Sequence, residues 1–219
     1  MDKSNNRILI ITGGRIDDSF LSQLVKKEKY NLIIVADHGL YAADRLNLNI
    51  DYIIGDFDSV TESLLEKYRS SSTSIHTFPI EKDKTDTEIA IDFALMHMPT
   101  SIDIVGATGS RLDHVLANIH LLMLPLQHGI QAALLDFNNK IYLKNKSFSI
   151  QKDQQFGDYI SFLPLGDKVS GLTLTGVKYP LNHISYMAGS SLGISNVIIE
   201  EKASIEFSEG ILVAIESKD

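Results

Sequence analysis

The chain has 219 residues, 44% of them hydrophobic, which suits a globular protein with a sizeable core, and a formal net charge of -8 that argues against a nucleic-acid-binding protein. It has no cysteine, so disulfides, zinc thiolates and cysteine nucleophiles are excluded. It shows no apolar signal region at its start and no apolar stretch approaching the ~20 residues that span a bilayer, so we expect a cytoplasmic protein without a membrane partner.

Strands and helices alternate in the first part of the chain. Apolar runs rich in β-branched residues predict strands at residues 7–11, 32–36, 52–54, 101–105 and 131–135. Apolar residues at helical spacing predict helices at residues 17–27, 40–46, 60–68, 86–98 and from about 114 to 124, where Pro125 would stop the last one; Met96 and Leu116 are expected on buried faces. This alternation predicts an α/β domain with a parallel sheet covered on both faces.

The character of the sequence changes near residue 145. Short β-branched runs follow at residues 159–163, 172–175, 197–199 and 211–215, with glycines between them and no long helical period. This pattern predicts a small antiparallel β-sandwich or barrel. We therefore expect two domains, at residues 1–140 and 141–219.

Two aspartates, Asp56 and Asp58, follow the third predicted strand. Ligands of open α/β sheets bind outside the carboxyl ends of the strands, where these residues would lie. If the backbone stays extended, both side chains point the same way and could hold Mg²⁺. A turn with two solvated aspartates is the alternative.

Thr85 and Glu88 form a capping-box pattern before the fourth predicted helix, in which Asp86 would favour the positive end of the helix dipole. Helix capping would by itself be enough to explain this pattern. Because helix N-termini also bind phosphate, it is equally compatible with a nucleotide site.

A glycine-rich stretch lies between the strand at residues 101–105 and the next helix. Gly106 and Gly109 could let backbone N–H groups approach phosphate, although the stretch matches neither a P-loop nor a full G-x-G-x-x-G motif. Arg111 offers a fork of donors suited to phosphate. Asp113 either orients that guanidinium or caps the helix.

Taken in order, these motifs resemble the thiamine pyrophosphokinase family. The resemblance rests on Asp37-His38-Gly39, Gly55-Asp56-Phe57-Asp58-Ser59, Lys82-Asp83-x-Thr85-Asp86, Gly106-x-x-Gly109-x-Arg111-x-Asp113-His114 with Asn118, and in the β-rich part Gly171-Leu172, Lys178-Tyr179-Pro180-Leu181 and Gly193-x-Ser195-Asn196. Two positions depart from the family pattern: His38 stands where a glycine is usual, and Val197 stands where a glutamate often follows.

The resemblance implies an α/β domain followed by a β-sandwich, in a homodimer whose active sites are shared between subunits. The implied reaction converts ATP and thiamine into AMP and thiamine diphosphate with Mg²⁺. Asp56, Asp58 and Asp86 would hold the metal, Asp37 would bind metal or orient the hydroxyl, and Arg111 would neutralise charge on the transferred group. ATP contacts are expected from Lys82, Asp83, Thr85, Gly106, Gly109, Arg111, Asp113 and His114.

In the β-rich part, Ser195 and Asn196 are expected to contact the aminopyrimidine of thiamine, with an ordinary turn as the alternative. Two other functions compete with the kinase. One is a Mg²⁺-dependent phosphohydrolase that uses Asp56 or Asp58, and the other is a non-catalytic nucleotide-binding sensor. The hydrolase would release phosphate without thiamine, and the sensor would bind ATP without forming AMP.

Overall fold

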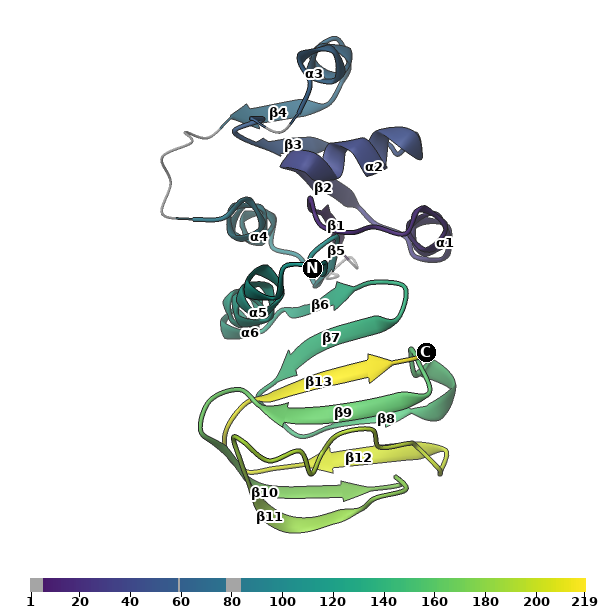
Figure 1. Ribbon diagram of the computed structural model, residues 1–219, viewed down its shortest axis with the longest axis vertical. Helices are drawn as coiled ribbons and strands as arrows, with labels where there is room; N and C mark the ends of the chain where they lie inside the picture. Colours follow the sequence, from purple (N-terminus) through teal and green to yellow (C-terminus); the bar gives the residue numbers. More distant parts are fainter. Residues whose placement is uncertain (1–5, 59, 78–83) are drawn as a thin grey trace, which may run out of the picture. The chain divides into compact units, whose positions relative to one another are not determined.

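A computed structural model describes residues 6–58, 60–77 and 84–219 of the chain (Figure 1). The chain divides into two compact units at the boundary between Phe137 and Asn138. Unit 1 contains the parallel strands and nearly all of the helical structure, and unit 2, Asn138–Asp219, is built from antiparallel strands. This is the predicted fold class.

Unit 1 is built on a parallel sheet. Its strands are β1 (Arg7–Ile11), β2 (Leu32–Ala36), β3 (Tyr52–Gly55), β4 (Ser74–Thr77), β5 (Ser101–Val105) and β6 (Gln131–Leu135), in the spatial order β4-β3-β2-β1-β5-β6. At the centre, Ile10 is in register with Ile34 on one side and Ile104 on the other. These central strands are almost wholly buried because helices cover both faces of the sheet, which explains their unbroken apolar sequences.

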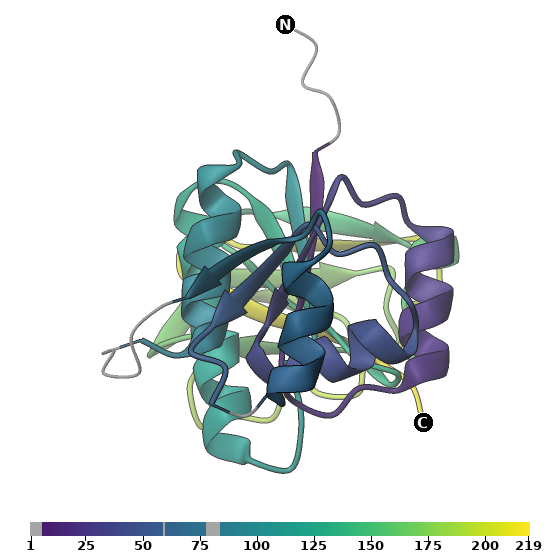
Figure 2. The same ribbon diagram turned by 90° about the horizontal axis from the view of Figure 1, so that it is seen from above.

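The helices of unit 1 are α1 (Asp18–Lys27), α2 (Leu40–Arg45), α3 (Glu62–Arg69), α4 (Asp86–Met96), α5 (Leu112–Leu121) and α6 (Met123–Gln127), with a short 3₁₀ turn, η1, at Asp37–Gly39. Helices α4, α5 and α6 lie on one face of the sheet, and α1 and α2 lie on the other (Figure 2). Thr85 caps α4 by accepting a hydrogen bond from the Glu88 N–H at 3.3 Å, as the capping-box pattern predicted.

Several predicted details of unit 1 are wrong. Pro125 does not stop a helix: α5 ends at Leu121, and Pro125 lies in the first turn of α6, where a missing N–H costs nothing because such groups have no partner within the helix. Met96 and Leu116, expected on buried faces, are 69% and 60% exposed. The edge strand β4 was not predicted, because its Ser-Ile-His-Thr sequence is largely exposed and carries little apolar signal.

Unit 2 consists of two antiparallel sheets. One has the strand order β7-β13-β9 and the other β11-β10-β12-β8. The bounds are β7 (Asn139–Lys144), β8 (Phe148–Gln151), β9 (Tyr159–Pro164), β10 (Lys168–Thr175), β11 (Leu181–Met187), β12 (Lys202–Glu206) and β13 (Leu212–Ser217), with a 3₁₀ turn, η2, at Lys152–Gln154.

The two sheets of unit 2 pack through apolar side chains. Phe148 on β8 meets Phe162 on β9 with ring centroids 6.2 Å apart, and the buried Tyr186 on β11 donates a hydrogen bond to the Phe162 carbonyl at 3.0 Å. Residues 197–199, predicted as a strand, make only an isolated bridge between Ile198 and Val177. Strands β7, β8, β11 and β12 were missed because polar residues interrupt their apolar pattern.

Candidate active site

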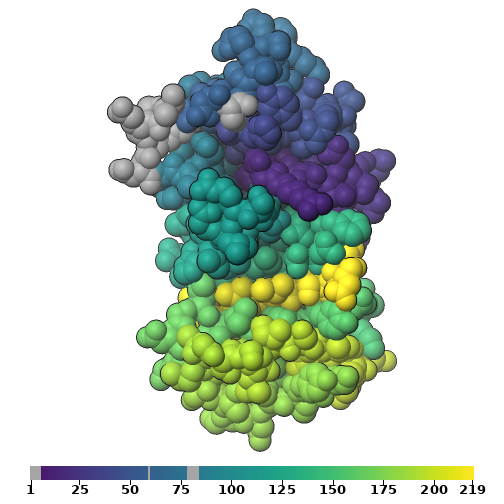
Figure 3. Space-filling view, viewed as in Figure 1, coloured from purple at the N-terminus to yellow at the C-terminus, as the bar shows by residue number. Residues whose placement is uncertain are grey.

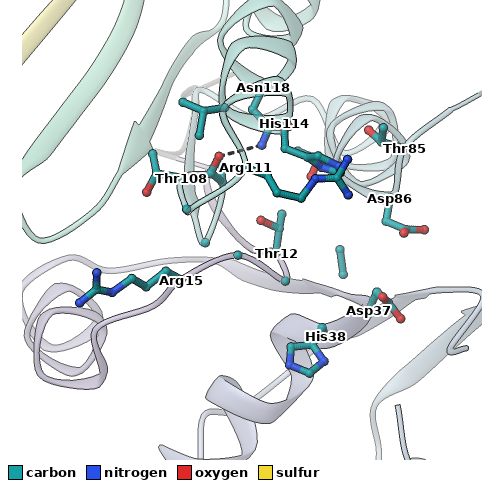
Figure 4. A pocket seen from close by; sticks show the side chains of 18 of the residues that line it. Thr12, Arg15, Asp37, His38, Thr85, Asp86, Thr108, Arg111, His114 and Asn118 are labelled. Carbon is teal, nitrogen blue, oxygen red and sulfur yellow. Dashed lines mark hydrogen bonds between the residues drawn. The ribbon is translucent and has the colours of Figure 1, made fainter. Parts of the chain in front are cut away.

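A cavity of about 620 Å³ lies in unit 1, at the carboxyl ends of the parallel strands (Figure 4). Residues 12–15 after β1, residues 36–38 around the end of β2, residues 106–111 after β5, residues 85–87 at the start of α4 and three residues of α5 line it. From β1 the chain builds the sheet in one direction, through β2, β3 and β4, and then returns to place β5 on the other side of β1. The direction of strand addition therefore reverses at β1, beside the cavity. Such switch points are where open α/β sheets bind ligands.

The loops after β1 and β5 are joined through their backbones at the floor of the cavity. The N–H of Gly14 donates to the Gly106 carbonyl at 2.8 Å, and the N–H of Arg15 donates to the Thr108 carbonyl at 3.1 Å. Gly106 has a φ of +79°, and a Cβ there would lie 2.3 Å from the Thr12 carbonyl oxygen. Gly106 is therefore required by this close approach, whereas a Cβ on Gly109 would meet nothing closer than 3.6 Å.

Three carboxylates gather at one side of the cavity. Asp37, Asp56 and Asp58 each offer an oxygen, and these oxygens all lie within 4.8 Å of one another. The backbone between Asp56 and Asp58 is not extended, which was the condition for the predicted pairing, because Phe57 has a φ of +63° and the Asp58 N–H donates to Asp56 Oδ1 at 3.2 Å. A turn therefore brings the two carboxylates together, and Asp37 in η1 joins them from the neighbouring strand end.

Like charges shape the electrostatics of this acidic cluster. The negative charge of Asp56 is the largest influence that raises the pKa of Asp58 above its ordinary value, and the charges of Asp37 and Asp86 contribute further. Repulsion of this kind favours binding of a cation, which would offset the crowded negative charge.

Asp86 lies half-buried in the first turn of α4 and lines the cavity together with Thr85. In Figure 4 these two residues stand across the cavity from Arg15, at the same end as Asp37. Asp86 is not one of the three clustered carboxylates, although its charge reaches Asp58. Lys82 and Asp83, which we expected to contact ATP, lie outside the described residues.

Arg111 and Asp113 form an exposed ion pair at the rim. Arg111 donates through Nη2 to Asp113 Oδ2 at 2.6 Å and through Nε to Oδ1 at 3.3 Å. The pairing raises the pKa of Arg111 and lowers that of Asp113. Of the two roles considered for Asp113, the structure shows the contact with the guanidinium, and α5 has no side-chain cap.

Helix α5 also contributes to the wall of the cavity. His114 lines it, and the buried Asn118 donates through Nδ2 to the Ala107 carbonyl at 2.7 Å (Figure 4). Asn118 thus fixes the loop that carries Gly106 and Gly109.

The sequence reasoning missed the contribution of the loop after β1. We interpreted Thr12-Gly13-Gly14 as a turn only, yet Thr12, both glycines and Arg15 line the cavity, as do His38 and Thr108. The glycine pair directly after the first strand was the signal that could have pointed to this loop, because ligands approach the backbone closely at such positions.

Ser195 and Asn196 lie in unit 2 and differ in their surroundings. Asn196 is 2% exposed, and its amide bonds the backbone of Tyr179 twice: Oδ1 accepts from N–H at 3.0 Å, and Nδ2 donates to the carbonyl at 2.8 Å. Ser195 is exposed, with a φ of +57° and an N–H that donates to Ser161 Oγ at 3.0 Å. Ser195 is therefore exposed, whereas the amide of Asn196 is buried and bonded to the Tyr179 backbone.

Comparison with known proteins identifies the family of this chain. Residues 21–134 match the family model described as "Thiamin pyrophosphokinase, catalytic domain", and residues 147–212 match "Thiamin pyrophosphokinase, vitamin B1 binding domain". The thiamine pyrophosphokinase of Bacillus subtilis is 41% identical over 166 residues, which are 75% of this chain and 77% of that protein.

Solved structures agree with the sequence matches. The crystal structure of the Bacillus subtilis thiamine pyrophosphokinase superposes with a TM-score of 0.87 at 35% identity, covering 98% of this chain and 100% of that one. A thiamin pyrophosphokinase family protein from Enterococcus faecalis gives a TM-score of 0.84 at 30% identity, with 98% and 100% coverage. This chain belongs to the thiamin pyrophosphokinase family.

Proposed function

We propose that the acidic cluster and the cavity beside it form the active site of a thiamine diphosphokinase. The reaction transfers the pyrophosphoryl group of ATP to the hydroxyl of thiamine and gives thiamine diphosphate and AMP. The observation that carries the residue assignment is the meeting of Asp37, Asp56 and Asp58 beside a cavity whose floor is two glycine-rich loops. The hydrolase and sensor alternatives find no support in the family matches.

The acidic cluster fits a magnesium ion. Oxygens that share one ion at about 2.1 Å cannot be more than about 4.2 Å apart, so oxygens within 4.8 Å need only a small contraction to converge on it. We propose Asp56 and Asp58 as ligands, with Asp37 as the third carboxylate. Asp86, at the same end of the cavity as Asp37, would be a further ligand, as the family resemblance implies. When bound, the ion supplies positive charge to the phosphate oxygens that the carboxylates alone would repel.

The remaining lining groups position and neutralise the nucleotide. The thiamine hydroxyl oxygen attacks the β-phosphorus and loses its proton, and the bond between that phosphorus and the bridging oxygen of AMP breaks. We propose that Arg111 exchanges its contact with Asp113 for a phosphate oxygen, where its guanidinium offsets charge in the transition state. Thr85, Gly106, Gly109 and His114 would complete the ATP contacts, together with Lys82 and Asp83 outside the described residues.

Thiamine would be bound with the help of unit 2. Ser195 offers an exposed hydroxyl to the aminopyrimidine, whereas Asn196 would act by holding the Tyr179 backbone in place. We further propose that the protein is a homodimer in which unit 1 of one copy and unit 2 of the other form each site. Exposed apolar side chains support this, because Leu112 and Leu116 are 72% and 60% exposed on α5, which lies at the surface in Figure 3.

Cytoplasm remains the proposed location, since the reaction consumes ATP. Among the described residues, no helix is long and apolar enough to cross a membrane.

The activity is tested with purified protein, ATP, Mg²⁺ and thiamine, with the products separated by chromatography. AMP and thiamine diphosphate should appear in equal amounts, and omission of thiamine or of the metal should abolish both. ADP and orthophosphate formed at the same rate without thiamine would favour the hydrolase.

The shared site is tested by sedimentation and by subunit mixing. Asp56→Asn damages the metal cluster, and Ser195→Arg places a bulky cation against the positively charged thiamine. If sites form across subunits, mixing the two inactive variants restores part of the activity, because a mixed dimer contains one intact site. A monomer at working concentration would contradict the proposal.

A further inference from the structure

Arg15 is a cation of the cavity that the proposed function leaves without a role. It follows the glycine pair after β1, and its backbone position is fixed because its N–H donates to the Thr108 carbonyl at 3.1 Å. The preceding Gly14 packs so closely that a Cβ there would lie 2.2 Å from the Gly106 carbonyl oxygen. The root of the Arg15 side chain is therefore held on a rigid loop, while the side chain itself is exposed.

The guanidinium of Arg15 is available, in contrast to that of Arg111. Within the described chain, no carboxylate lies within the 4.0 Å that defines an ion pair with Arg15. Arg111, the other arginine of the cavity wall, makes two hydrogen bonds to Asp113. Asp17, two residues beyond Arg15, caps α1, where it accepts from the Phe20 N–H at 2.8 Å and from Ser19 Oγ at 2.6 Å. These hydrogen bonds are the main causes of its lowered pKa, and the charge of Arg15 is the smallest contribution.

The position of Arg15 defines which part of a nucleotide it could reach. In Figure 4, Arg15 extends from its loop on the side of the cavity away from Asp37 and Asp86. The metal that the carboxylates would hold would supply positive charge to the pyrophosphoryl group being transferred, so the β- and γ-phosphates belong at the acidic side. The part of ATP that remains for the Arg15 side is AMP, whose charge is on its α-phosphate.

We propose that Arg15 binds the α-phosphate of ATP and stabilises AMP as the leaving group, an inference that rests on the proposed function. When the bond between the β-phosphorus and the bridging oxygen breaks, the electron pair stays on that oxygen and adds negative charge to the α-phosphate. The thiamine hydroxyl supplies the attacking oxygen and releases its proton, so atoms and charge balance. A guanidinium fork is suited to bind such a phosphate through two parallel hydrogen bonds.

The test measures binding by calorimetry, separately from turnover. The probes are AMP, adenosine and inorganic pyrophosphate with Mg²⁺, and the proteins are the wild type, Arg15→Gln, Arg15→Lys and Arg69→Gln. Arg69 is a matched control, because it is an exposed arginine on α3 that pairs with Glu66 at 2.8 Å and lies away from the cavity.

Arg15→Gln should weaken AMP binding by about 10- to 100-fold, the change expected for loss of a hydrogen bond to a charged group. Adenosine and pyrophosphate should bind as they do to the wild type, Arg15→Lys should recover part of the AMP affinity, and Arg69→Gln should change nothing. In turnover, Arg15→Gln should raise KM for ATP and lower kcat, because the contact strengthens as AMP leaves, while KM for thiamine stays unchanged.

Two results would overturn the inference: unchanged AMP binding in Arg15→Gln, or an equal loss of AMP and pyrophosphate binding, which would assign Arg15 to the transferred group. Thermal melting of each variant separates these results from loss of the fold, and Arg15→Lys provides the comparison if Arg15→Gln melts early. Failure of the wild type to form thiamine diphosphate would overturn the proposed function instead, and the AMP titration still decides whether Arg15 contacts a phosphate.

Discussion

Gly106→Ala should weaken both the fold and the activity, because Gly106 joins the two loops at the floor of the cavity. Its φ of +79° costs an L-residue about 1–2 kcal/mol. The added Cβ would lie 2.3 Å from the Thr12 carbonyl oxygen, which must retreat by roughly 1 Å to reach ordinary contact distance. Overpacking of this kind costs ~1–3 kcal/mol, so we expect the free energy of unfolding to fall by about 2–5 kcal/mol in total.

The activity of Gly106→Ala should fall by roughly 100-fold, since a displacement of about 1 Å at a reacting site has that effect. The measurements are urea unfolding and initial rates of AMP formation. Three matched variants separate the causes, because two of them each share one feature with Gly106 and the third shares neither. Gly129 has a similar φ of +70° with nothing within 4 Å, Gly14 has the close contact without a left-handed φ, and Gly109 has neither.

Gly129→Ala should therefore lose only the conformational ~1–2 kcal/mol and keep its activity. Gly14→Ala should lose stability and activity through the clash alone, and Gly109→Ala should leave the free energy of unfolding nearly unchanged. If Gly106→Ala unfolds at the same urea concentration as Gly129→Ala and retains full turnover, the close approach of the two loops is not as described.

Three further predictions concern single side chains. Asp56→Asn and Asp58→Asn should each lose most activity and demand more Mg²⁺ while melting like the wild type; normal turnover at ordinary Mg²⁺ would show that the metal assignment is wrong. Thr85→Ala should lose about 1 kcal/mol of stability through its missing cap, whereas Asp86→Asn should mainly lose activity, as melting curves beside initial rates would reveal. Asn196→Ala should lose ~1–3 kcal/mol in chemical unfolding, because the Tyr179 backbone groups lose their partner; an unchanged midpoint would contradict the structural role of its amide.

The sequence predicted unit 1 well because its strands are buried on both faces. The sequence Leu-Ile-Ile-Val-Ala of β2 has no polar residue, and burial alone explains such a run. The cap at Thr85 was also predictable, since it depends on residues three positions apart. Strand β4 was not, because its pairing at the sheet edge depends on backbone hydrogen bonds and needs no apolar pattern.

The acidic cluster was predicted in part, for reasons that are visible in its geometry. Asp56 and Asp58 are neighbours in sequence, so their meeting could be expected, although the turn at Phe57 could not. A carboxylate oxygen of Asp37 lies within 4.8 Å of oxygens of Asp56 and Asp58 because of the strand order and because Asp37 has a backbone φ of +44°. No local sequence pattern specifies either feature. Arg15 was missed for the same reason, because its loop meets the loop after β5 only in the folded sheet.

Asp113 and Asn196, for which the sequence left alternatives open, make contacts that no local pattern specified. Asp113 pairs with Arg111, and Asn196 pairs with Tyr179, 17 positions away. Sequence offers both residues as cap, turn or ligand because asparagine and aspartate accept all of these roles. Which of these contacts each residue makes depends on which partner the folded chain brings beside it.

The proposed reaction moves an intact pyrophosphoryl group from ATP to thiamine. The most direct test uses ATP labelled with ³²P in its γ-phosphate and follows the label into the products. The protein, Mg²⁺, labelled ATP and thiamine are incubated, and the products are separated. We predict that the label appears in thiamine diphosphate in step with unlabelled AMP, and that Asp58→Asn slows both together. Label recovered as free orthophosphate, or in thiamine monophosphate beside ADP, would contradict the account.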